Sequence, residues 1–135
     1  MSKQISVFIE NRKGRLGEVL DVLKESDVNI LSLSIADTSE YGLLRIISDK
    51  PQAGQTALSS AGFSAMLTDV CIVKVPHTPG ALQNILRVIS DEELNVEYMY
   101  GLSVAAEEAS IVVKPSDLEK AKKVFEGHGI ETIEL

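Results

Sequence analysis

Two short polar loops, one in each half of the chain, hold the residues best suited to bind a ligand. They span residues 10–16 and 76–82, and each places a glycine, Gly14 or Gly80, just before a segment with helical apolar spacing. The free N–H groups and the positive dipole end of a helix's first turn favour a carboxylate. Glycine lets the backbone approach a ligand closely. Each loop is therefore a candidate anion site.

The loops recur because the chain repeats itself at a constant shift. Gly14 aligns with Gly80 and Leu16 with Leu82, and one extra residue later in the chain brings residues 62–63 over 129–130. The same constant shift pairs Val7 with Val73, Leu20 with Leu86, Val22 with Val88 and Asn29 with Asn95. No linker rich in Pro, Gly or Ser separates the halves. We therefore expect two tightly joined domains, 1–69 and 70–135.

Each half has the periodicity of strand, helix, strand, strand, helix, strand. In the first half, alternating apolar residues over 5–9 predict a strand, and Leu16, Val19, Leu20 and Leu23 form one helical stripe. Strands are expected over 28–35, 43–47 and 63–67, with a turn at 37–40. Pro51 suits the first turn of the second helix. The residues expected on the core face of that helix are Ala53, Ala57, Leu58 and Ala61.

This element order predicts an α+β fold made of two ferredoxin-like βαββαβ repeats. The second strand of each repeat is expected at a sheet edge, where its backbone would lack partners. Pairing the two edges removes that exposure. The predicted product is a continuous eight-stranded antiparallel sheet with four helices on one face.

The loops, and the segments that follow each first helix, resemble those of the ACT domain family. That family's loop typically reads Asn/Asp-x-Pro-Gly-x-Leu, and its first helix leads to Asn-Ile or a similar pair. The matching residues are Asn11, Gly14, Leu16, Asn29 and Ile30 in the first half, and Pro79, Gly80, Leu82, Asn95 and Val96 in the second. Lys13 stands where proline is usual, and His77 stands where Asn or Asp is usual.

The resemblance implies that a free amino acid binds between neighbouring domains, where the loop of one faces the second strand of the other. Asn11 would then lie near Asn95, and His77 near Asn29. The Asn11 side chain can both donate and accept hydrogen bonds, so it could bind either end of an amino acid. The candidate ligand-binding residues are Asn11, Arg12, Lys13, Gly14, Arg15, Leu16, Asn29, Ile30, His77, Thr78, Pro79, Gly80, Ala81, Leu82, Asn95 and Val96.

Composition argues against several classes of partner. Lys and Arg number 13 against 20 Asp and Glu, and the net charge of -7 would repel nucleic acid. Cys71 is the only cysteine, which excludes an intramolecular disulfide and a thiolate zinc site. Neither a signal peptide nor an apolar run long enough to cross a bilayer is present. We expect a cytoplasmic protein with no membrane partner, metal or cofactor.

These features bear on three classes of function: an enzyme, an amino-acid sensor and an interaction subunit. An enzyme needs a nucleophile with a base, a metal cluster or paired carboxylates, and the sequence offers none of these in a plausible cleft. We therefore expect a regulatory amino-acid sensor without catalytic activity. Its partner would be an enzyme of amino-acid metabolism. The alternative is a non-catalytic interaction or regulatory subunit of such an enzyme that has lost ligand binding. The glycines and asparagines could also serve only as turn and strand-start residues.

The predicted sheet leaves one face without helices. Phe8, Ile72 and Tyr98 are expected on that face, where a large exposed apolar surface would mark an interface. We therefore expect a homodimer.

Overall fold

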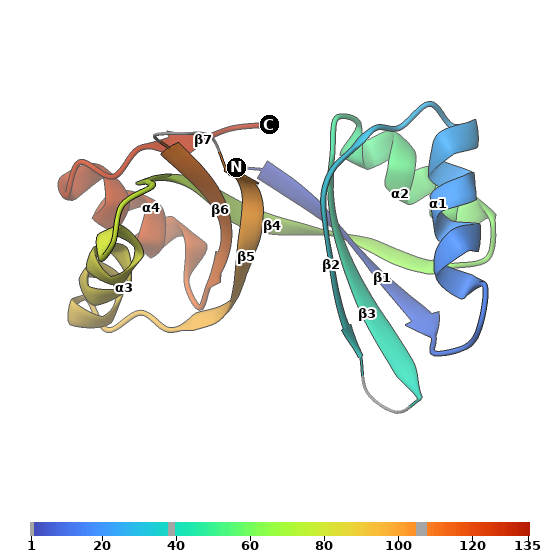
Figure 1. Ribbon diagram of the computed structural model, residues 1–135, viewed down its shortest axis with the longest axis horizontal. Coiled ribbons are helices and arrows are strands. Elements are labelled where there is room, and N and C mark those ends of the chain that lie inside the picture. The colour runs from blue at the N-terminus through green and yellow to red at the C-terminus, as the bar shows by residue number, and fades with distance from the viewer. Residues whose placement is uncertain (1, 38–39, 105–107) are drawn as a thin grey trace. The chain divides into compact units, whose positions relative to one another are not determined.

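The computed structural model describes residues 2–37, 40–104 and 108–135, which form seven antiparallel strands and four helices (Figure 1). The chain divides into two compact units. One is Lys3–Thr68, and the other is Asp69–Leu135 together with Ser2. The predicted turn at 37–40 includes residues 38 and 39, which lie outside the described residues.

The first unit has the element order βαββαβ and the strand order β2-β3-β1-β4. Its elements are β1 (Ser2–Glu10), α1 (Arg15–Glu25), β2 (Ile30–Asp37), β3 (Tyr41–Ser48), α2 (Pro51–Ser60) and the first part of β4 (Ser64–Pro76). Both helices cover one face of these strands (Figure 1). This is the arrangement of a ferredoxin-like fold.

The second unit repeats the order with the strands arranged β7-β4-β6-β5. After the rest of β4 come α3 (Ala81–Asp91), β5 (Val96–Val104), β6 (Glu108–Pro115), α4 (Leu118–Gly127) and β7 (Thr132–Ile133). The last strand is short, and its register pairs Ile72 with Ile133 and Val73 with Thr132. Beyond those pairs, Lys74 N–H donates to the Glu131 carbonyl at 2.9 Å.

The predicted eight strands are seven because one strand serves both units. A strand was expected to end at residue 67, just before the domain boundary at residues 69 and 70, but β4 runs without a break from Ser64 to Pro76. Thr68 and Val70 are β-branched, and the segment contains no glycine and no internal proline, so nothing interrupts the extended backbone. The predicted pairing of the second strands is also wrong within the chain, since β2 and β5 are the terminal strands of the order.

Each unit has its own apolar core between helices and strands. Ile5, Val7 and Leu23 are fully buried in the first, as are Val73 and Phe125 in the second. The expected core face of α2 was partly wrong. Gly54 and Leu58 are its buried residues, whereas Ala53 and Ala61 are exposed. The buried position 54 is a glycine because α2 packs closely against its neighbours there.

Candidate functional site

The glycine before each loop helix has a left-handed backbone. Gly14 has φ +87° and Gly80 has φ +84°, and each is the N-terminal cap residue of its helix. A Cβ placed on either glycine would have no atom within 4 Å among the described residues. Glycine is therefore required by the backbone conformation rather than by crowding within the unit. Among the described residues, the space around the Cβ position of both glycines is open.

Neither loop helix is capped by a side chain. The Gly14 carbonyl accepts from Glu18 N–H at 3.0 Å, and the Gly80 carbonyl accepts from Asn84 N–H at 3.1 Å, but no side chain caps the first-turn amides. In contrast, α4 is capped by Asp117, whose carboxylate accepts from Lys120 N–H at 3.1 Å. The two loops thus leave the positive ends of α1 and α3 available to an anion.

The two asparagines after the first helix of each repeat have matching backbone partners. Asn29 N–H donates to the Asp49 carboxylate at 2.8 Å, and Asn95 N–H donates to Ser116 Oγ at 3.1 Å. In return, the carbonyls of both asparagines accept from the amides of the same partners. Both asparagines are exposed. Their backbones therefore hold the start of β2 or β5, and Ile30 and Val96 begin those strands.

Within one unit, the loop precedes the first helix and the asparagine follows it, so the two lie at opposite ends of that helix. The helix α1 has 11 residues, so roughly 16 Å of helix separates Asn29 from the loop. The same holds for α3 and Asn95. The candidate residues therefore form two groups in each unit, and proximity of Asn11 to Asn95 or of His77 to Asn29 stays a prediction.

The first loop is more strongly charged and more internally bonded than the second. Arg15 is held by Glu18 and by Glu10, whose carboxylate lies 3.9 Å from Arg15 Nη2, and its guanidinium carbon lies 4.3 Å from the centre of the Phe63 ring. Only 17% of the Arg15 side chain is exposed. Arg12 Nε lies 3.1 Å from Glu10 but remains exposed. Asn11, Lys13 and Gly14 are exposed, and Leu16 is half-buried.

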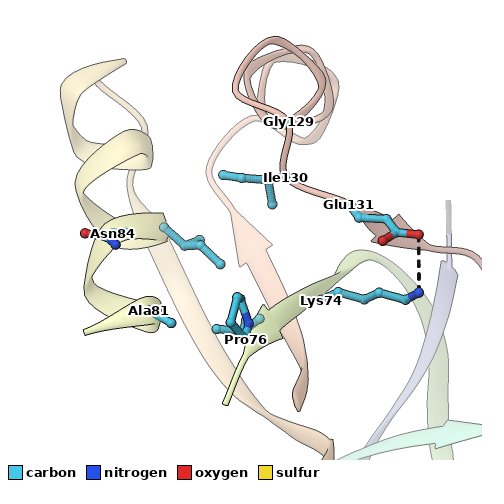
Figure 2. A pocket seen from close by; sticks show the side chains of 9 residues that line it. Lys74, Pro76, Ala81, Asn84, Gly129, Ile130 and Glu131 are labelled. Carbon is cyan, nitrogen blue, oxygen red and sulfur yellow. Dashed lines mark hydrogen bonds and ion pairs between the residues drawn. The ribbon is translucent and has the colours of Figure 1, made fainter. Parts of the chain in front are cut away.

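The second loop is exposed from Pro76 to Gly80, which includes His77, Thr78 and Pro79. Leu82 is 37% exposed, and Ala81 is half-buried. Behind Ala81 the structure has a cavity of about 350 Å³ that the sequence did not predict. Its polar lining residues, Lys74, Asn84 and Glu131, were not among the candidates (Figure 2). The alignment of Arg15 with the smaller Ala81 is the sequence signal that could have indicated this cavity.

Outside the two loops, the groups with reactive side chains are a buried cysteine and scattered acidic and histidine residues. Cys71 lies in the core of the second unit, and burial raises the pKa of its thiol, which disfavours the reactive thiolate. Over the ranges described, no three His, Cys, Asp or Glu side chains gather as metal ligands would. None of the described helices is long and apolar enough to span a bilayer.

The fold and loops define a pair of ferredoxin-like α+β units, each with a helix start that no side chain caps. The family model for the ACT domain pair matches residues 1–134. The chain therefore belongs to the ACT domain pair family. No curated protein matches the sequence.

Solved structures show the same architecture. Protein BT0572 from Bacteroides thetaiotaomicron is 35% identical, with a TM-score of 0.93 over 98% of this chain and 91% of that one. The ligand-free regulatory subunit of aspartate kinase from Thermus thermophilus is 16% identical, with a TM-score of 0.67 over 93% and 91% of the two chains. The Thermus flavus subunit is 18% identical, with a TM-score of 0.64 over 93% and 90%.

Proposed function

We propose that the chain is a regulatory protein that binds a free amino acid through the loops before α1 and α3. The observation that carries the proposal is the pair of open helix starts, each formed by a left-handed glycine and left without a side-chain cap. The amides of the first turn bind the ligand's carboxylate. Asn11 or Asn95 provides a polar partner for its ammonium group. The ligand lies between neighbouring domains.

Family membership and the related folds support a regulatory role. A two-unit chain of this fold forms the regulatory subunit of an aspartate kinase in two Thermus species, so the fold is compatible with a subunit that regulates a separate enzyme. We propose that this chain likewise acts on a partner enzyme of amino-acid metabolism. Ligand binding would then shift the equilibrium between two arrangements of the protein. The alternative is an interaction subunit that has lost the ligand.

Substitutions in the loops test this function by calorimetry against each free amino acid. Gly14→Val and Gly80→Val strain the left-handed backbone and place a side chain over the first-turn amides, so each abolishes binding at its own loop. Asn11→Ala and Asn95→Ala each lower affinity about tenfold to hundredfold, as expected for about 1.5–3 kcal/mol lost on removing a hydrogen bond to a charged group.

Gly62→Val is the control for backbone strain. Gly62 also has a left-handed backbone, with φ +91° and nothing within 4 Å of a Cβ, but it lies outside both loops. It should bind the amino acid as the parent does. If the three loop variants and Asn95→Ala all bind like the parent, the loops are only turns.

We also propose a homodimer formed through β2. Leu33 and Ile35 pair with Ile46 and Leu44, which are fully buried, so all four lie on the same side of the sheet as the helices. Yet Leu33 and Ile35 are 41% and 50% exposed. They extend the core surface past the helices on a strand that is terminal in the sheet order of the described residues, and we propose that a second copy pairs along this strand. Ile72, expected to be exposed on the face without helices, alternates with the core residues Cys71 and Val73 but is buried.

Light scattering at micromolar concentration should give twice the mass of the chain. Ile35→Lys places a charge in the proposed interface and should yield monomer. Leu135→Lys changes a residue of similar exposure, 53%, at the other end of the chain and should leave the dimer intact. A monomeric parent, or a dimeric Ile35→Lys variant, would refute this interface.

A further inference from the structure

The two units differ at the position behind the loop helix. In the second unit this position is a cavity of about 350 Å³ between the start of α3, the end of β4 and the segment before β7 (Figure 2). In the first unit the aligned positions hold Arg15 and Phe63, which pack against each other at 4.3 Å. Ala81 and Ile130 replace them in the second unit. A methyl group thus stands where a guanidinium fills the space in the first unit.

The residues that surround Arg15 in the first unit are also replaced in the second unit. Glu10 and Glu18 bind the Arg15 guanidinium in the first unit. Their aligned residues in the second unit are Pro76 and Asn84, which carry no charge and both line the cavity. The arginine and its two carboxylates are therefore absent together, as expected if the second unit has been adapted to keep this space open.

The chemistry of the cavity is that of an apolar chamber with polar groups at its edges. Val75, Ile85 and Ile130 supply aliphatic surface, and Figure 2 shows Ile130 pointing toward Pro76 across the space. On one side, Lys74 Nζ and Glu131 Oε1 form an ion pair at 3.2 Å, with 34% and 67% of the two side chains exposed. On the other side lies the Asn84 amide. Small-molecule sites combine apolar walls with a few polar groups in this way, and at about this volume.

We propose that this cavity binds an amino acid with an aliphatic side chain, and that the first unit has no equivalent site because Arg15 occupies it. The aliphatic group lies on Val75, Ile85 and Ile130. The Glu131 carboxylate receives the ligand's ammonium group, and Lys74 receives its carboxylate, so the ligand exchanges with an existing ion pair. The class of ligand rests on the proposed function, and the cavity lies behind the second loop, with which it shares Pro76 and Ala81.

Calorimetry with L-leucine as the probe, and L-lysine and L-aspartate as polar comparisons, tests the site. Ala81→Arg introduces the residue of the first unit and should lower L-leucine affinity at least tenfold. Gln83→Arg adds the same side chain to an exposed position of α3 outside the cavity, so it should bind as the parent does. Glu131→Gln is a surface change that should leave folding intact and lower affinity about tenfold.

The outcomes separate the two proposals. Loss of L-leucine binding in Ala81→Arg and Glu131→Gln, with Gly80→Val still binding, supports the cavity. If both cavity variants bind like the parent while Gly80→Val does not, the cavity is no site and the loop function stands. Preference of the parent for L-lysine or L-aspartate overturns the aliphatic assignment. A parent that binds none of the free amino acids overturns both proposals.

Discussion

Replacing Phe125 by alanine should lower the free energy of unfolding of the second unit by about 3–5 kcal/mol. Phe125 comes from α4 and is fully buried in a core with Val73, Ile89 and Val113. Its ring is among the largest fully buried side chains in the chain. The substitution loses the transfer free energy of the ring and leaves a cavity that the surrounding strands cannot fill. Because a folded domain is stable by only about 5–15 kcal/mol, this unit would become marginal.

Urea unfolding followed by circular dichroism measures the change. Phe8→Ala is the matched control, since the same ring is 52% exposed there, and a surface change of this kind should shift stability by about 0.5 kcal/mol or less. Equal effects of the two substitutions would contradict the assigned core. Amino-acid binding by the first loop should survive in Phe125→Ala if the units are independent in stability.

Much of the fold could be predicted because periodicity reports local structure directly. The alternating residues of β1 and the apolar stripe of α1 lie where expected, and the repeat predicted the second copy of both. The pattern could not show that residues 64–76 form one strand. Two short apolar runs with polar Asp69 between them look like two strands, and only pairing across the sheet decides whether the backbone continues. The predicted order of the strands in the sheet was wrong for the same reason, because strand order depends on non-local contacts.

The candidate site was predictable only in its backbone elements. Glycine before a helix start predicted the open first turns, since few other residues adopt a left-handed backbone. The partners of side chains were not predictable. Arg15 looked like one charge among several in a polar loop, yet it packs on Phe63, which follows it by more than forty residues. The second unit lacks that pair, and only the structure shows that a cavity lies in its place.

The two repeats thus share the same backbone arrangement and differ in the side chains behind their loops. Both keep the left-handed glycine, the uncapped helix and the clamped asparagine. The first keeps an arginine cluster behind its loop, and the second keeps an open apolar chamber. This asymmetry at aligned positions is the observation from which the ligand site of the second unit is proposed.

The position of Gly54 in α2 should tolerate no added side chain. An ideal Cβ on Gly54 would lie 2.8 Å from Ile5 Cδ1, 3.2 Å from Leu23 Cδ2 and 3.5 Å from Val28 Cγ1. Ile5 and Leu23 are fully buried, so their methyl groups have little room to move. Gly54→Val must therefore push α2 away from α1 and β1, and overpacking of this kind costs about 1–3 kcal/mol.

The same substitution at Gly17 is the control, because a Cβ there meets nothing within 4 Å. Gly17→Val should change the free energy of unfolding by no more than about 0.5 kcal/mol, whereas Gly54→Val should lower it several times more in the same urea titration. The glycine of α2 is thus a packing requirement, which explains why the sequence pattern of that helix misassigned its core face. If Gly54→Val is as stable as Gly17→Val, α2 does not lie this close to Ile5 in solution.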